Sequence, residues 1–212
     1  MPTIHRAEEA TYTWLQQYYP RVTDYHDRRS LFDFRRQVMQ SHEHYQIDLS
    51  LMRRVMLERL AIDFGYEPAP MIEQGFELFY RLRHDVEFYD DVFPVLDQLK
   101  RRYKLGSISN GNASAALTPL KDYFDGFINA ADVMARKPDR RIFDAFCERL
   151  DIEPGHCVYV GDDPRFDVEG ARKAGMRTVW VNRDDRPWPD DLQTAEVEIR
   201  DLYQLLEFLD SH

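Results

Sequence analysis

Several residue types are scarce in this chain, and each shortage excludes a class of protein. Only two of the 212 residues are cysteines, Cys147 and Cys157, so a disulfide framework is excluded and a reducing, cytoplasmic location is expected. Lys and Arg number 28 against 38 Asp and Glu, and a formal net charge of −10 does not suit nucleic-acid binding. No apolar run approaches the roughly 18 residues of a membrane span. We therefore expect neither nucleic acid nor a membrane as a partner.

Residues 1–85 are predicted to form a helical domain. Glycine is nearly absent here, with only Gly65 before Gly75. Four apolar side chains recur at the spacing of one helical face: Leu49, Met52, Met56 and Leu60. We expect helices near residues 3–18, 28–45, 49–63 and 68–83, packed as an antiparallel bundle. Asp48 or Ser50 is expected to cap the third of these helices.

Residues 86–212 show a different pattern, in which short apolar strands alternate with amphipathic helices. The expected strands are residues 105–109, 127–129, 157–160, 178–181 and 197–199. Residues 157–160 are wholly apolar, which predicts a buried parallel strand. Strand–helix alternation indicates a parallel sheet covered on both faces, and such sheets bind ligands at the carboxyl ends of their strands. The residues that follow each strand are therefore the candidates for a site.

A polar turn follows the first of these strands. Ser109 and Asn110 precede a glycine at the point where the strand stops. Backbone N–H groups in such a turn can hold an anion, and the Ser109 hydroxyl can add a donor. The alternative is an ordinary turn capped by Ser or Asn.

An acidic turn follows the apolar strand at 157–160. It carries three carboxylates within six residues, Asp162, Asp163 and Asp167. Charges of one sign so close together repel unless a cation lies among them, and hard oxygen ligands favour Mg²⁺. The alternative is a solvated turn in which Asp163 or Asp167 caps the next helix. Lys137, just before a helix expected to begin near residue 140, could face a bound anion, or simply be solvated.

Taken in order, the Ser-Asn-Gly turn, the Lys-Pro pair and the Gly-Asp-Asp turn resemble the haloacid-dehalogenase-like superfamily of phosphatases. The resemblance implies that Ser109, with Asn110, binds a phosphoryl group, that Lys137 neutralises it, and that Asp162 and Asp167, with Asp163 as a further candidate, hold Mg²⁺. The match is best to the subgroup with an all-helical cap, which includes phosphatases of FMN and of ribitylaminouracil phosphate. It implies an α/β fold, with a three-layer parallel-sheet core at 86–212 and an all-helical cap at 1–85.

One element of that family is missing from the sequence. Family members begin with an apolar strand that ends in Asp-x-Asp, whose first Asp attacks phosphorus, and no such segment occurs here. We therefore expect a core that lacks its first strand, with two exposed strand edges or a gap of about 10 Å. We assign the nucleophile to no residue, and expect this chain to be inactive or impaired. Three explanations stay open: a truncated chain, a non-catalytic relative that binds Mg²⁺ and phosphate, or another parallel-sheet fold.

The resemblance implies a Mg²⁺-dependent phosphomonoester hydrolase that acts on a small phosphorylated metabolite. Haloacid dehalogenases share the fold and the Ser-Asn-Gly turn but work without metal, and they lack the acidic pair Asp162-Asp163. A receiver-type regulatory module would need its acidic pair early in the chain, whereas here it comes late. A protein-interaction role would predict no stabilisation by Mg²⁺.

Overall fold

The computed structural model describes residues 2–211 and divides the chain into two compact units. The helical unit consists of residues up to 87 together with 111–118, and the α/β unit consists of residues 88–110 and those from 119 onward. The predicted boundary at 85/86 stays a prediction, and the grouping of 111–118 with the helices was not anticipated. No helix among the described residues is both long enough and apolar enough to cross a membrane.

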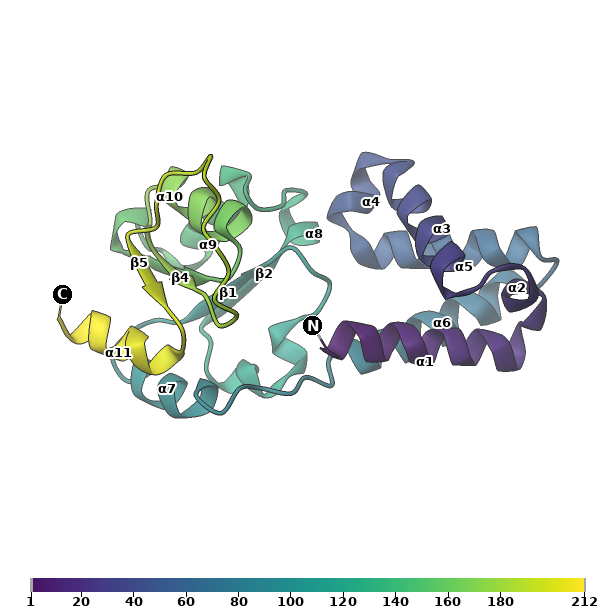
Figure 1. The fold of residues 1–212 in the computed structure, drawn as a ribbon, viewed down its shortest axis with the longest axis horizontal. Helices are drawn as coiled ribbons and strands as arrows, with labels where there is room; N and C mark the ends of the chain where they lie inside the picture. The colour runs from purple at the N-terminus through teal and green to yellow at the C-terminus, as the bar shows by residue number, and fades with distance from the viewer. Residues whose placement is uncertain (1, 212) are drawn as a thin grey trace. The chain divides into compact units, whose positions relative to one another are not determined.

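The described part of the helical unit contains six α-helices and the short 3-10 helix Ala115–Leu117 (Figure 1). The α-helices are α1 (Pro2–Tyr18), α2 (Pro20–Tyr25), α3 (Arg28–Gln40), α4 (Glu43–Ile47), α5 (Leu49–Asp63) and α6 (Pro68–Arg83). The prediction of one helix over 28–45 is wrong, because the chain leaves helical geometry at His42, and α2 was missed. Asp48 caps α5 as predicted, since its carboxylate accepts hydrogen bonds from the amides of Ser50 (3.0 Å) and Leu51 (2.8 Å).

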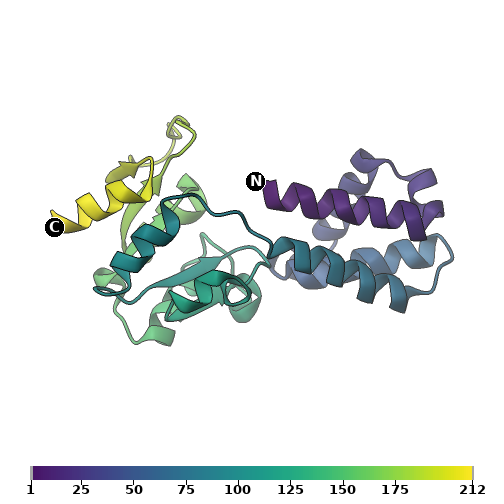
Figure 2. The same cartoon turned by 90° about the horizontal axis from the view of Figure 1, so that it is seen from below.

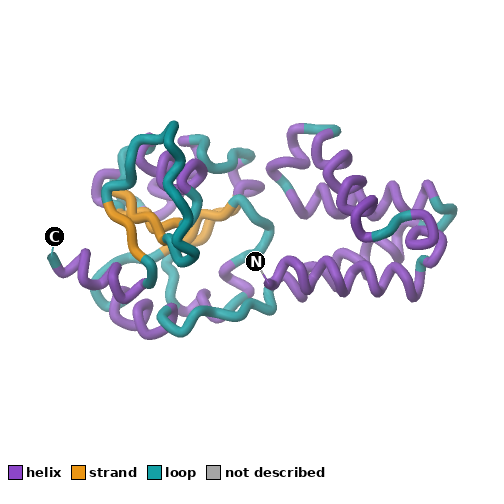
Figure 3. Tube along the Cα trace, viewed as in Figure 1, coloured by secondary structure: helices purple, strands orange, loops and turns teal. Residues whose placement is uncertain are grey.

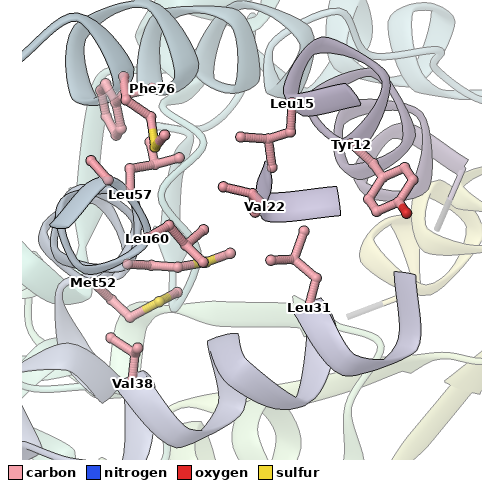
Figure 4. Close-up of a cluster of buried hydrophobic side chains, with 12 residues drawn as sticks. Tyr12, Leu15, Val22, Leu31, Val38, Met52, Leu57, Leu60 and Phe76 are labelled. Atoms are coloured by element: carbon pink, nitrogen blue, oxygen red, sulfur yellow. The ribbon is translucent and has the colours of Figure 1, made fainter. Parts of the chain in front are cut away.

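The core of the helical unit is formed by apolar side chains that converge from five helices (Figure 4). Leu15, Val22, Leu57 and Leu60 are fully buried there. Burying one such side chain stabilises the fold by roughly 1.5–3 kcal/mol, so the packed faces, rather than helix propensity, hold this unit together.

A charged cluster lies beside this core. The guanidinium of the buried Arg53 donates two hydrogen bonds to the Glu8 carboxylate, at 2.6 and 3.2 Å, and Arg35 pairs with the same carboxylate. The Arg53 guanidinium also lies 3.6 Å from the centroid of the Phe79 ring. Burial alone would raise the pKa of Glu8, but the two arginines outweigh it and hold that pKa below its ordinary value.

The α/β unit contains all the strands of the described chain (Figure 3). Its strands are β1 (Gly106–Ser109), β2 (Gly126–Asn129), β3 (Val158–Gly161), β4 (Arg177–Val181) and β5 (Val197–Ile199). Its α-helices are α7 (Val92–Leu99), α8 (Ala130–Val133), α9 (Arg140–Leu150), α10 (Gly170–Lys173) and α11 (Leu202–Asp210). Figures 1 and 2 show α7 and α11 side by side on one face of the strands, and they contact each other. The α/β class with parallel strands is thus confirmed.

The strands form two separate parallel sheets rather than one. β1 pairs with β2, and the other sheet has the order β3-β4-β5. β1 and β3 are not paired with each other, so each has an edge with no neighbouring strand among residues 2–211. The expectation that β3 would be buried is wrong, because all four of its residues are only half-buried. An apolar strand is half-exposed here because no strand within residues 2–211 pairs with its second edge.

The two cysteines, Cys147 in α9 and Cys157 just before β3, lie close together. Their Sγ atoms are 4.0 Å apart, and both thiols are free. Burial and the neighbouring sulfur raise the pKa of Cys147 to about 12, and burial also raises the pKa of Cys157. Both side chains therefore stay protonated at neutral pH.

Candidate active site

Lys137 connects the two sheets at the carboxyl ends of β1 and β3. Its Nζ atom lies 2.6 Å from Asp167 Oδ1, 3.0 Å from the carbonyl oxygen of Ile108 in β1, and 3.0 Å from the Tyr159 hydroxyl in β3. An ammonium has three N–H donors, so each has a partner. The side chain is only 11% exposed. The sequence alternative of a solvated lysine therefore does not hold.

The backbone of Lys137 is fixed by the turn after β1. The Asn110 amide donates to the Lys137 carbonyl at 3.0 Å, and its oxygen accepts from the Lys137 amide at 2.7 Å. Ser109 is the last residue of β1 and directly precedes this clamp. Asp139 caps α9 by accepting a hydrogen bond from the Arg141 amide at 2.9 Å. The structure thus brings Ser109, Asn110 and Lys137 into one place.

The carboxylate of Asp167 is the centre of the acidic turn. It lies in the π-helical turn Pro164–Glu169 and is buried. Besides Lys137, it accepts from the Tyr159 hydroxyl (3.2 Å) and from the amides of Asp162 (3.2 Å) and Asp163 (3.1 Å). A Cβ on Gly161 would lie 2.4 Å from the Asp167 Cβ, which explains why the motif needs glycine there.

Asp163 has the capping role that the sequence left open. Its Oδ1 accepts hydrogen bonds from the amides of Arg165 and Phe166, each at 2.8 Å. These bonds satisfy two of the free N–H groups at the start of the turn. The role of Asp163 as a metal ligand stays a prediction.

Asp162 presents the most accessible carboxylate of the three. Its side chain is 69% exposed, and Oδ2 lies 3.9 Å from Arg186 Nη2. Its carbonyl oxygen accepts from Trp180 Nε1 (3.1 Å) and from Arg186 Nη2 (2.7 Å), which orients the residue. Partial burial and then the charge of Asp167 raise the pKa of Asp162, against the opposing effect of Arg186. A cation at this point would relieve that repulsion.

These donors fit Mg²⁺, although they do not form a complete cage. Among the described residues, no group of three or more Asp, Glu, His or Cys side chains is arranged to hold a metal. Mg²⁺ usually keeps several waters and is held by one or two carboxylates together with a substrate phosphate. Asp162 and Asp167 supply two such carboxylates, but Asp167 Oδ2 would have to give up a backbone N–H to bind a metal directly.

Sequence reasoning missed Tyr159. Its hydroxyl contacts both Lys137 Nζ and Asp167 Oδ1. Burial and the Asp167 charge raise the pKa of Tyr159 well above its ordinary value. The sequence did offer one signal, because Tyr159 is the one residue with a polar side-chain group in this apolar strand. A buried Tyr hydroxyl usually has a hydrogen-bond partner, so a polar contact could have been expected there.

Comparisons with known proteins agree with this fold and this order of residues. The family described as haloacid dehalogenase-like hydrolase matches residues 28–181. The chain is 28% identical over 194 residues to the 5-amino-6-(5-phospho-D-ribitylamino)uracil phosphatase YigB of Escherichia coli (strain K12). The aligned region covers 90% of this chain and 79% of that enzyme. It is 30% identical over 139 residues to the N-acylneuraminate-9-phosphatase of Mus musculus and spans 56% of that enzyme's length.

Solved structures give the same assignment. The crystal structure of 2-haloacid dehalogenase from Pseudomonas syringae pv. Tomato DC3000 superposes with a TM-score of 0.92 at 32% identity, covering 100% of this chain and 92% of that one. The family match extends over more than half of the chain. The protein is therefore a member of the haloacid dehalogenase-like hydrolase family.

Proposed function

We propose that this protein is a Mg²⁺-dependent hydrolase of phosphate monoesters, acting on a small phosphorylated metabolite in the cytoplasm. The observation that carries the proposal is Lys137, a buried cation held where the polar turn after β1 meets the acidic turn after β3. Although Asp167 already pairs with this ammonium, a cation fixed at the carboxyl ends of parallel strands, where such sheets bind their ligands, favours an anionic ligand.

Each residue has a proposed role in binding the phosphoryl group. Ser109 and the backbone of the turn donate hydrogen bonds to its oxygens, while Asn110 holds Lys137 against the turn. Asp162, with Asp167, would hold Mg²⁺. When bound, the metal would offset negative charge on the phosphoryl oxygens.

Lys137 has to change one contact to bind an anion. All three of its N–H groups have partners, and the Tyr159 hydroxyl is the one neutral side chain among them. Since Tyr159 also contacts Asp167, it keeps a partner when Lys137 turns away. Without phosphate, the Tyr159 hydroxyl would thus accept the hydrogen bond that Lys137 Nζ later donates to the phosphate.

The attacking carboxylate is assigned to none of residues 1–212. Removing the nucleophile from a catalytic unit typically costs several orders of magnitude in rate. We therefore expect this chain to bind phosphate and Mg²⁺ but to turn over substrate weakly. The named relatives support the substrate class, because the printed names of YigB and of the mouse enzyme are those of phosphatases of small metabolites.

A second candidate is metal-independent dehalogenation of a 2-haloacid. The similarity to the Pseudomonas syringae dehalogenase structure favours it. Against it stands the acidic turn itself, in which the exposed carboxylate of Asp162 lies beside Asp167; partial burial and then the charge of Asp167 raise the pKa of Asp162, and a bound cation would offset that repulsion.

Thermal unfolding with and without ligands tests the proposal. We expect phosphate or orthovanadate to raise the melting temperature, and to do so more strongly with Mg²⁺ than with EDTA. The same protein is then assayed for release of p-nitrophenol from its phosphate ester and of chloride from 2-chloropropionate. Chloride release that is unaffected by EDTA, with no response to phosphate, would overturn the phosphatase assignment in favour of the dehalogenase.

A further inference from the structure

Asn182 follows the last residue of β4 and fixes the backbone of Arg186. Its Oδ1 atom accepts a hydrogen bond from the Arg186 amide at 2.8 Å, and its Nδ2 atom donates to the Arg186 carbonyl at 2.9 Å. Asn182 is buried, and its Nδ2 atom also donates to Glu198 Oε1 in β5 at 2.7 Å. Both N–H groups of this amide therefore have partners, which holds the backbone of Arg186 in place.

The same arrangement occurs at the end of β1. There Asn110 accepts a hydrogen bond from the Lys137 amide at 2.7 Å and donates to the Lys137 carbonyl at 3.0 Å. Each asparagine directly follows a parallel strand, and each holds the backbone of a cationic residue. Because such sheets bind ligands at the carboxyl ends of their strands, the second clamp indicates a second cation that serves the site.

The guanidinium of Arg186 reaches the acidic turn after β3. Gly161 in β3 lies opposite Trp180 in β4, so Asp162 and the loop after β4 lie at the same edge of the sheet. Arg186 Nη2 donates to the Asp162 carbonyl at 2.7 Å and lies 3.9 Å from Asp162 Oδ2. Trp180 Nε1 donates to the same carbonyl at 3.1 Å. The guanidinium is thus held beside a proposed metal ligand.

The protein uses little of the hydrogen-bonding capacity of this guanidinium. A guanidinium has five N–H donors, but within residues 2–211 only Nη2 of Arg186 has a hydrogen-bond partner. Asp162 is also the only carboxylate within 4 Å of it in this part of the chain, since Asp185 pairs with Arg200 at 2.6 Å. The Arg186 side chain is 45% exposed, so a ligand can reach it.

We propose that Arg186 binds a second anionic group of the substrate, a carboxylate or a phosphate, while Ser109 and Lys137 bind the phosphoryl group. The planar guanidinium fits either anion because its N–H groups form a fork that matches their paired oxygens. A metal held by the Asp162 carboxylate would leave Arg186 without its carboxylate partner, which favours an anion from the substrate. This inference rests on the proposed function, and it narrows the substrate class to phosphate monoesters that carry a second acidic group.

Isothermal titration calorimetry of the full chain with Mg²⁺ tests the inference with three ligands. Ethyl phosphate carries one acidic group, whereas 2-phosphoglycolate adds a carboxylate and ethane-1,2-diyl bisphosphate adds a second phosphate. We expect at least one of the latter two to bind about tenfold more tightly than ethyl phosphate, as hydrogen bonds between charged groups would give. The ligand that binds more tightly identifies the second group as carboxylate or phosphate.

Three variants separate Arg186 from general effects of charge. Arg186→Gln should remove the preference for the second acidic group, and Arg186→Lys, which keeps the charge but lacks the fork, should retain part of it. Arg200→Gln is the matched control, because it removes an exposed arginine that pairs with Asp185 in the same loop. That variant should keep the full preference.

The possible failures of the two proposals differ. Equal binding of all three ligands by the wild-type chain, or an unchanged preference in Arg186→Gln, would contradict the role of Arg186 and leave the phosphate site standing. Loss of the preference in Arg200→Gln would likewise contradict it, since any positive charge in the loop would then suffice. Binding of none of the three ligands would refute the proposed function and this inference together.

Discussion

Lys137 and Asp167 form a buried ion pair with 2.6 Å between Nζ and Oδ1, and this pair joins the two sheets of the α/β unit. The lysine lies just before α9 and the aspartate in the turn after β3, and the lysine also reaches the carbonyl of Ile108. Burying two charges costs desolvation free energy, and removing one partner leaves the other charge buried without a counter-charge. The same ion pair is therefore expected both to stabilise the α/β unit and to take part in the proposed phosphate site.

Lys137→Met should destabilise the α/β unit by about 3–5 kcal/mol, because it leaves the Asp167 carboxylate buried without a cation. Urea unfolding followed by circular dichroism measures this change. The double variant Lys137→Met/Asp167→Leu should recover much of the loss, since neither charge then remains buried. Lys173→Met is the control, because Lys173 is exposed and pairs with Glu169 at the surface. Equal effects of the two single lysine variants would contradict the burial argument.

Asp162→Asn should abolish stabilisation by Mg²⁺ and, without metal, should make the protein more stable at pH 7. The fold raises the pKa of Asp162, so its ionised form costs stability above that raised value. The gain from the substitution should disappear as the pH falls below about 3.8, where the carboxyl is protonated in both states. Melting curves at several pH values, with and without Mg²⁺, measure both effects.

Asp191→Asn is the matched control for that experiment. Asp191 pairs with Arg165 on the surface and lies outside the proposed metal ligands. It should leave the response to Mg²⁺ intact. If Asp162→Asn retained the full metal response, Asp162 could not be a ligand.

Gly161→Ala should distort the acidic turn and destabilise the fold by about 1–3 kcal/mol, because its Cβ would lie 2.4 Å from the Cβ of Asp167. A loss of the phosphate response should accompany the change, since Asp167 positions Lys137. Gly155→Ala is the control, as nothing lies within 4 Å of a Cβ at that position. Unfolding curves that coincide for the two variants would show that the turn tolerates the methyl group.

Glu8→Gln should weaken the helical unit at neutral pH by about 1–3 kcal/mol, because the buried Arg53 loses its counter-charge. The wild-type carboxyl has a pKa below its ordinary 4.5. Its stabilisation is therefore complete above about pH 4.5 and is lost as the pH falls through the lowered pKa. The two proteins should thus converge in stability in acid. Glu9→Gln, which affects only the exposed pair with Arg28, should follow the wild-type pH profile.

Sequence patterns predicted most elements here because each depended on local signals. Helices α5 and α6 cover the predicted ranges 49–63 and 68–83, and Asp48 caps α5 as expected. Strand–helix alternation holds only in part of the α/β unit, since no helix lies between β4 and β5. The role of Tyr159 could not be predicted, because its partner Lys137 lies 22 residues away and only the fold brings the two together. Exposed strand edges were predicted from the missing first strand, but that β3 would be one of the exposed strands depends on which strands pair, and composition does not encode this.

The protonated thiols of Cys147 and Cys157 also make the chain convenient to label. A cysteine introduced at an exposed position, such as Glu58 in the helical unit or Ser211 in the α/β unit, would ionise more readily and react with a maleimide dye, while the two native sulfurs would react far more slowly. Two such dyes, one on each unit, would report by energy transfer whether phosphate and Mg²⁺ change the separation of the helical and α/β parts.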